Sequence, residues 1–295
     1  MPAVSDLSPL AALSASLSGL VAATAPSLAS VHSHRSVSSG FVWKPGLIVT
    51  ADEALAEEGA MAVTLASGQC LAASVVGRDP TTDIALLRVA TSDLKPVVLE
   101  ASAPGTGALV VAVGGREGQA VAALGVIVRS GPAWRSMRGG EIDARIELDL
   151  ALRSHAEGGV AIDAGGHPFG MTVFGPRRRV LVIPAATIAR VATQLEAYGK
   201  VARGYLGLAL QPVRLDRQGG MGAMVMSVDA DGPGAKAGIH QGDVIQGWRG
   251  QPIRSLNAVL RALGPASVGT TVPVALSRGG ETRAVDLVVG ERPDR

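Results

Sequence analysis

Few side chains in this sequence could carry out chemistry by type and spacing. Ser154 and His155 are neighbours, and a serine beside a histidine could be a nucleophile with its base. Adjacent residues on a strand or in a loop point apart, so we interpret the pair as part of a surface loop. His32 and His34 would lie on one face of a strand, but two ligands are too few for a specific metal site. We expect these histidines at an exposed strand end.

Two further features concern sulfur and charge. Cys70 is the only cysteine, which excludes an intrachain disulfide framework and a cluster of cysteine metal ligands. It lies in a strand pattern, so we expect a small buried side chain rather than a reactive thiol. Arg177, Arg178 and Arg179 form a compact basic run. A solvated face is the simpler interpretation of this run, and an acidic partner is the alternative.

The composition excludes several classes of protein. Of the 295 residues, 47% are hydrophobic and 18% are charged, so the chain can bury a core and is not disordered throughout. The net charge is only +2 and aromatic residues make up 3%, which argues against a nucleic-acid partner. The 38 glycines and 17 prolines favour turn-rich β structure over a helical bundle.

The N-terminal segment predicts a short amphipathic helix that packs on the domain after it. Ser8 and Pro9 are typical of a helix start, and apolar residues recur at helical spacing from Leu10 to Val21. The segment from Leu10 to Ala25 is interrupted by serines and is too short for a membrane span, so we expect no membrane insertion. A signal peptide would need a positive start, but the first basic residue is Arg35, so we expect a cytoplasmic protein.

The rest of the chain divides into two β-rich parts. Residues 27–182 contain many short apolar segments separated by glycine turns, which is typical of a β-sandwich or barrel. Residues 185–198 predict a helix that ends at Gly199. After a linker, residues 205–290 predict a smaller β-rich unit with a helix over 256–263.

The order and spacing of several segments carry a family resemblance. They are Ser39 to Val42, Leu47 to Thr50, Val76 to Val89, Leu124 to Ile127, Arg203 to Gly207 and Gly232 to Ile239. Together they resemble the HtrA/Deg family. The resemblance implies a mostly β chain, with a trypsin-like double six-stranded β-barrel followed by a PDZ domain. We expect a protease-like domain with the N-terminal helix over residues 1–200 and the PDZ domain over residues 201–295.

The resemblance also locates the family's catalytic positions. The family's histidine follows the Ile-Val-Thr strand, and here Glu53 falls at that position. The family's aspartate is matched by Asp83. The family's nucleophile stands immediately before a Gly-Gly pair, where this chain has Glu157, and the glycine of the oxyanion loop is matched by His155. Two of the three catalytic residue types are therefore replaced.

These replacements predict the loss of serine endopeptidase activity. The carboxylate of Glu157 has no proton for a base to remove and would repel a developing oxyanion. The side chain of Glu53 cannot reproduce the geometry of an imidazole, and His155 has a Cβ where the family uses the freedom of glycine. We therefore expect a pseudoprotease and not an enzyme. An active serine endopeptidase with an atypical site is the alternative.

A metal-binding scaffold is a further alternative. If the fold is kept, the carboxyl groups of Glu53, Asp83 and Glu157 converge and cannot all stay charged without compensation. With His155 nearby, they could be ligands of a divalent cation. Splayed, solvated carboxylates are the simpler interpretation, so we predict no cofactor.

The second domain should still bind peptides. A PDZ domain adds an extended peptide as a strand at a sheet edge, and backbone donors of the preceding loop hold its C-terminal carboxylate. By resemblance, this loop and strand are Tyr205, Leu206, Gly207 and Leu208. Candidates for the apolar pocket on the facing helix are Val259, Leu260 and Leu263.

The leading hypothesis is therefore a non-catalytic HtrA-like protein that binds peptide or protein C-termini as a chaperone, adaptor or scaffold. Family members are commonly trimers assembled through N-terminal aromatic residues. Here no aromatic residue precedes Phe41, so a homo-oligomer is possible but this route to it is in doubt.

Overall fold

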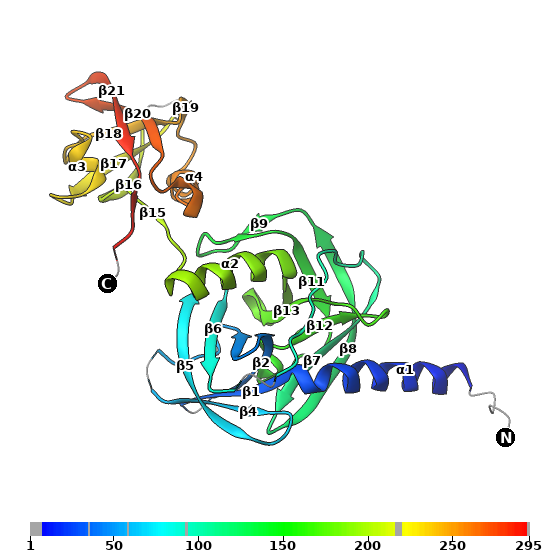
Figure 1. The fold of residues 1–295 in the computed structure, drawn as a ribbon. Coiled ribbons are helices and arrows are strands. Elements are labelled where there is room, and N and C mark those ends of the chain that lie inside the picture. The colour runs from blue at the N-terminus through cyan, green and yellow to red at the C-terminus, as the bar shows by residue number, and fades with distance from the viewer. Residues whose placement is uncertain (1–7, 35, 58, 92–93, 216–219, 294–295) are drawn as a thin grey trace, which may run out of the picture. The chain divides into compact units, whose positions relative to one another are not determined.

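The structure is a computed structural model that describes residues 8–34, 36–57, 59–91, 94–215 and 220–293 (Figure 1). Contacts within the chain divide it into two compact units, residues 1–201 and residues 202–295. Both units consist mainly of antiparallel strands, as the glycine-rich, turn-rich composition predicts.

Two closed six-stranded barrels make up the first unit, which confirms the predicted double barrel. The strands of the first barrel, in the order β1-β2-β3-β6-β5-β4, are β1 (Leu28–Ser33), β2 (Ser36–Lys44), β3 (Leu47–Thr50), β6 (Ile84–Val89), β5 (Cys70–Asp79) and β4 (Met61–Leu65). The strands of the second, in the order β11-β14-β13-β12-β7-β8, are β11 (Arg145–Asp149), β14 (Val180–Pro184), β13 (Pro168–Phe174), β12 (Val160–Asp163), β7 (Leu109–Arg116) and β8 (Gln119–Gly131). Between β8 and β11 the chain forms a small hairpin, β9 (Trp134–Arg135) and β10 (Glu141–Ile142).

A continuous apolar core joins the two barrels and a helix. Phe41 and Leu86 of the first barrel and Met171 of the second lie in this core with Ile188 of α2 (Ala185–Tyr198). As predicted, α2 follows Pro184 and ends at Gly199, whose φ of +72° is the left-handed value that glycine adopts without strain. This core fixes the loops that carry the candidate site, because those loops connect strands of both barrels.

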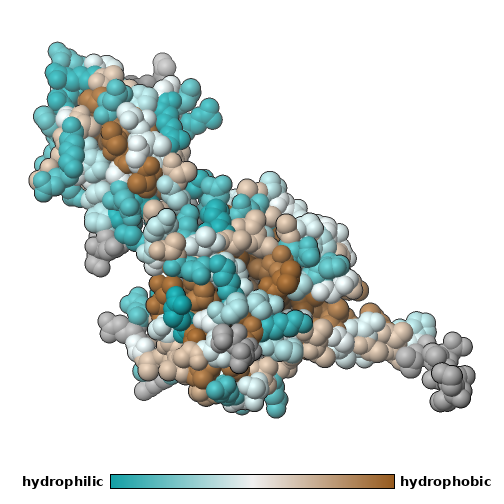
Figure 2. All heavy atoms as spheres, in the orientation of Figure 1, coloured by the Kyte–Doolittle hydropathy of each residue, from teal (hydrophilic) through white to brown (hydrophobic). Residues whose placement is uncertain are grey.

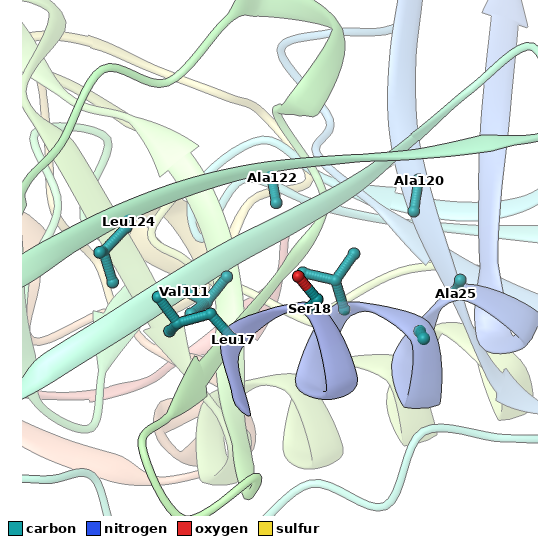
Figure 3. Close-up of a pocket in the computed structure, with 9 residues that line it drawn as sticks. Leu17, Ser18, Ala25, Val111, Ala120, Ala122 and Leu124 are labelled. Atoms are coloured by element: carbon teal, nitrogen blue, oxygen red, sulfur yellow. The ribbon is translucent and has the colours of Figure 1, made fainter. Parts of the chain in front are cut away.

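The predicted N-terminal helix is present as α1 (Pro9–Thr24), and Ser8 caps it by accepting the N–H of Ala11. Only its second half packs on the second barrel, where Leu17 lies across an open apolar groove from Ala122 and Leu124 (Figure 3). Val21 also lines this groove. Leu10 is 76% exposed, and apolar side chains line the projecting helix (Figure 2). The prediction of a helix packed along the domain is thus correct for one half of it only.

Cys70 corrects a second expectation. It is exposed, not buried, because it is the first residue of β5 and lies where this strand leaves its turn with β4. Exposed residues alternate along the first part of β5, starting at Cys70. The predicted strand is therefore correct, but Cys70 lies on its outward face and not on its inward face.

The second unit is a five-strand path with one added strand and short helices. In the order β16-β17-β18-β20-β21, the strands are β16 (Leu208–Arg214), β17 (Met221–Val228), β18 (Val244–Trp248), β20 (Thr271–Arg278) and β21 (Glu281–Val288), and β19 (Gln251–Pro252) pairs with β18. A two-stranded ribbon joins β15 (Gly204–Tyr205) to β22 (Gly290–Glu291), and the helices are α3 (Pro233–Lys236) and α4 (Leu256–Arg261). Its own apolar core includes Val225, Leu276 and Leu287.

Candidate functional site

Three acids predicted from the sequence come together, and we call Glu53, Asp83 and Glu157 the acidic centre. Asp83 lies in the turn before β6, and its Oδ1 accepts the backbone N–H of Glu53 at 2.7 Å. Burial raises the pKa of Asp83 to about 8, and the charges of Glu53 and Glu157 add to this rise. Asp83 therefore carries its proton at neutral pH, so the centre does not hold three negative charges.

Glu157 follows the short helical turn of residues 154–156 that leads to β12. Its Oε1 accepts the N–H of Phe174 at 3.1 Å. Burial raises the pKa of Glu157 and the charge of Glu53 adds to the rise, while the Phe174 N–H and the charge of Arg178 oppose it. The carboxyl is thus held in place by the second barrel.

Glu53 is the exposed member of the centre. Its carboxylate pairs with Arg138 Nη2 at 3.2 Å. Arg138 comes from the β9–β10 hairpin, which is fixed to the first barrel where Arg138 Nη1 donates to the carbonyl of Pro80 and Ser136 Oγ donates to the carbonyl of Thr81. The hairpin therefore supplies the acidic centre with a cation that sequence reasoning missed, because no local pattern connects it to Glu53.

A buried ion pair holds the loop that presents Glu53. Arg78 on β5 donates from Nε to the carboxylate of Asp52 and from Nη1 to the carbonyl of Ala56 at 2.8 Å. Asp52 is buried. These bonds brace the loop on both sides of Glu53, so its backbone N–H stays aimed at Asp83.

His155 occupies the turn before Glu157. Its carbonyl accepts Ser39 Oγ at 2.7 Å, which fastens the turn to β2. Burial and the charges of Arg116 and Arg153 lower the pKa of its imidazole. The backbone N–H of Glu157 donates to the carbonyl of Ser154, and the backbone N–H of Gly158 donates to the carbonyl of Thr172. Both backbone donors of this turn are therefore used within the chain.

The metal alternative gains no support from this arrangement. Across the described parts of the chain, no group of three or more His, Cys, Asp or Glu side chains is placed to hold a metal ion. The imidazole of His32 bonds to Thr64 Oγ1 at 3.0 Å instead.

In the second unit, the residues predicted to bind a peptide lie in the loop 205–208, at the start of β16, and on or directly after α4. Gly207 has φ +66°, and its carbonyl accepts the N–H of Asp229 at 2.9 Å. The Tyr205 hydroxyl bonds to the carboxylate of Asp229. A Cβ at position 207 would lie 2.9 Å from the Cα of Gly232, so only glycine fits there without displacement.

The helix side of the groove differs from the prediction in one respect. Val259 is buried in the core of the unit, whereas Leu260 is 52% exposed and Leu263 is half-buried against that core. Ser255 caps α4 by accepting the N–H of Ala258. Leu260 and Leu263 thus remain candidates to touch a peptide, while Val259 supports them from within.

Both units match known domain families. The family of the trypsin-like peptidase domain matches residues 38–171, and the family of the PDZ domain matches residues 204–289. A probable periplasmic serine endoprotease DegP-like of Brucella suis is 30% identical, over 87% of this chain and 53% of the relative. The protein of that name from Pseudomonas fulva is 32% identical, over 88% and 57%. The chain thus spans about half the length of these curated relatives.

Solved structures agree with this match over nearly the whole chain. The serine endoprotease from Yersinia pestis has a TM-score of 0.73 and 26% identity, covering 94% of this chain and 98% of that one. The chain belongs to the HtrA family. The HtrA-type protease AlgW with a decapeptide, at 23% identity and a TM-score of 0.73, covers 94% of this chain and 99% of its own and shares the fold.

Membership of the HtrA family corrects the expectation that the chain is not an enzyme. The curated relatives are named serine endoproteases, and the similar structures are named as proteases, which points to protease activity. The expectation rested on the residue types at three positions, Glu53, His155 and Glu157, whereas these likenesses extend over most of the chain.

The HtrA-family relatives also contradict the expected cytoplasmic location, because they are named periplasmic. In the described part of the chain, one helical stretch, Pro9–Ser27, is long and apolar enough by length and composition to cross a membrane, a test that signal sequences also pass. The absence of a basic residue before Arg35 was therefore too narrow a criterion for arguing against a signal peptide.

Proposed function

We propose that this HtrA-family chain binds the C-termini of peptides or proteins with apolar last residues, in the groove between β16 and α4. Such binding suits a chaperone, adaptor or scaffold. The names of the relatives support a periplasmic site of action. The resemblance to the family supports self-association, which light scattering on the purified protein tests.

The position of β16 carries this proposal. It ends the strand order β16-β17-β18-β20-β21 among the described residues, so its outer edge offers backbone groups to an added strand. The side chains of Leu208 and Leu210 are partly buried on the core of the unit and leave an apolar surface beside that edge. A peptide can therefore gain backbone hydrogen bonds and apolar contacts together.

The loop at the end of this edge suits a terminal carboxylate. The carbonyl of Leu206 accepts the N–H of Gly234 at 2.7 Å, and the carbonyl of Gly207 accepts that of Asp229. With these carbonyls turned into the unit, the loop is rigid before a ligand arrives. Rigid backbone donors bind an anion with little loss of entropy.

Replacing Gly207 tests the groove. We expect G207A to weaken binding of a peptide ending in Val by at least about tenfold, because the added Cβ would meet Gly232 at 2.9 Å and φ is +66°. Fluorescence anisotropy measures the affinity. The matched control is G269A, which shares a positive φ of +77° but has open space around its Cβ. Equal affinities for G207A and G269A would contradict the proposal.

The names of the relatives favour a second candidate function, hydrolysis of peptide bonds in the cleft of the first unit. Its centre offers carboxyl groups, and Asp83 keeps its proton because burial raises its pKa to about 8. A protonated carboxyl can give its proton to the leaving nitrogen while an ionised neighbour activates the attacking water. We expect hydrolysis in this cleft to use carboxyl chemistry.

Cleavage of unfolded casein tests the second candidate. D83N and E157Q should each lower the rate by roughly a hundredfold, whereas a fluorophosphonate, which reacts with serine nucleophiles, should leave it unchanged. D149N, which changes an exposed aspartate on β11, is the control. Cleavage that persists in D83N would exclude this chemistry. If the unaltered chain does not cleave casein, the second candidate fails and peptide binding still stands.

A further inference from the structure

Five arginines gather on one side of the second barrel, and we call them the arginine face: Arg129, Arg145, Arg177, Arg178 and Arg179. Arg129 on β8 is the cross-strand partner of Glu147 on β11, and Arg179 immediately precedes the neighbouring strand β14. Glu147 lies among them and the charge of Arg178 also acts on Glu157, so five positive charges face two acidic side chains. We propose that the arginine face binds an acidic segment of a partner protein.

Arg145 neutralises Glu147 by itself. Its Nε and Nη2 both lie 2.6 Å from Oε1 of the nearly buried Glu147, and its guanidinium lies 4.8 Å from the centre of the Trp134 ring. Two short charge-assisted bonds and a stacking contact fix this arginine in one orientation. Arg145 and Glu147 therefore form a rigid support for the other side chains.

Arg129 and Arg179 keep most of their hydrogen-bonding capacity. Arg129 Nη1 lies 3.7 Å from the Glu147 carboxylate, and Arg179 Nη1 lies 3.5 Å from it. These side chains are 59% and 55% exposed. A guanidinium has five N–H donors, so each retains donors directed to solvent that a second carboxylate can accept.

The turn between β13 and β14 adds Arg177 and Arg178 to the face. Both have left-handed backbone conformations, with φ of +59° and +56°, although glycine or asparagine would take these values with less strain. Arg178 lies 4.4 Å from the centre of the Phe174 ring. Arg177 forms no ion pair with any residue that the structure describes. The strained turn thus presents Arg177 without an ion pair beside Arg178, and backbone strain of this kind is typical of a ligand-binding turn.

The spacing of the face fits an extended polypeptide. Arg129 and Arg179 belong to β8 and the start of β14, which lie on either side of β11, so their strands are about 10 Å apart. Carboxylates two residues apart on an extended chain share one face and lie roughly 7 Å apart, a span that two long arginine side chains on these strands can meet. Nucleic acid fits less well, because the whole chain has a net charge of only +2 and few aromatic residues to stack on bases.

Binding of an acidic peptide tests this proposal. The probe is a short fluorescein-labelled peptide of alternating Glu and Ser with an amidated C-terminus, so that it lacks the carboxylate that the groove of the second unit reads. We expect anisotropy to show binding at low ionic strength that weakens as salt is added. R129Q/R179Q should lose at least about tenfold in affinity.

The control removes two charges elsewhere. R116Q/R283Q changes two exposed arginines outside the face and lowers the net charge equally, so it should bind the peptide as the unaltered chain does. R177Q/R178Q should also bind more weakly, and it leaves every contact of Glu147 in place if R129Q/R179Q proves unstable. Absence of binding, an equal loss in R116Q/R283Q, or tighter binding of duplex DNA or phosphatidylglycerol vesicles than of the peptide would overturn the proposal.

Discussion

D83N should make the first unit more stable at alkaline pH and remove much of its pH dependence. Burial raises the pKa of Asp83 to about 8, from the ordinary value of 3.8 that it has in the unfolded chain. The stabilisation by the neutral carboxyl is complete below the unfolded pKa. It declines as the pH rises, because the unfolded chain releases a proton that the folded chain retains, and it is lost once the pH exceeds the folded pKa.

Asparagine at position 83 removes the free-energy cost of ionising a buried carboxyl and leaves the local structure unchanged. It cannot ionise, its oxygen can still accept the N–H of Glu53, and asparagine tolerates the φ of +59° at this position better than most residues. At ~1.4 kcal/mol per pKa unit the shift has an upper bound of roughly 6 kcal/mol. We expect D83N to gain about half of this upper bound in stability, since relaxation of the protein and penetration of water reduce the cost of a buried charge. In a unit of this size that is a rise in Tm of roughly 6 to 12 °C at pH 9.

Thermal unfolding between pH 4 and pH 9 measures this effect. The Tm of the first unit should fall with rising pH in the unaltered chain and vary less in D83N, with the two values close together at pH 4. D149N, at an exposed position on β11, should behave as the unaltered chain. If D83N and the unaltered chain show the same pH dependence, Asp83 is not neutral in the folded state.

The sequence predicted those features that depend on local patterns and on order along the chain. Short apolar segments and glycine turns predicted the strands of both barrels, and Ser8 and Gly199 marked the helix ends where the structure has them. The family resemblance placed Glu53, Asp83 and Glu157 at one site, and the charges that act on Asp83 show that they meet there.

Features that depend on tertiary contact could not be predicted in this way. The pairing of Arg138 with Glu53 and the charge of Arg178 near Glu157 arise from a hairpin and a turn that fold back over the cleft. Helical spacing also could not separate Val259 from Leu260, because α4 has fewer than two turns and both of its neighbouring faces are apolar. Only the packing decides which of the two enters the core.

The second large effect concerns an ion pair in the second unit whose carboxylate is buried. Asp243 is 1% exposed, and Arg278 donates to it from Nε and from Nη2, each at 2.8 Å. The backbone N–H of His240 donates to the same carboxylate at 2.8 Å. These bonds tie the start of β18 to the end of β20, and the hydrogen bond from Arg278 lowers the pKa of Asp243.

We expect D243A to destabilise the second unit by ~2 kcal/mol, because it removes the buried carboxylate that accepts from Arg278 and from the N–H of His240. For a unit of this length, that lowers its Tm by roughly 8 to 16 °C. Calorimetry of the full chain should show the transition of the second unit moved down while that of the first unit stays. Since the folded pKa of Asp243 is lowered, the unaltered pair should stabilise the unit above the unfolded pKa and lose this effect as the pH falls through the folded pKa.

In D243A, binding of the C-terminal peptide should be lost when the second unit unfolds, because the loop beside Gly207 and the turn before Asp243 belong to one folded unit. Above the lowered Tm, D243A should no longer bind the C-terminal peptide, whereas the arginine face of the first unit should still bind its acidic peptide. D286A removes an exposed acid on β21 and is the control, with an expected Tm close to that of the unaltered chain. A shared Tm for D243A and D286A would mean that the Arg278 pair contributes no more than a surface ion pair, which is at most ~1 kcal/mol.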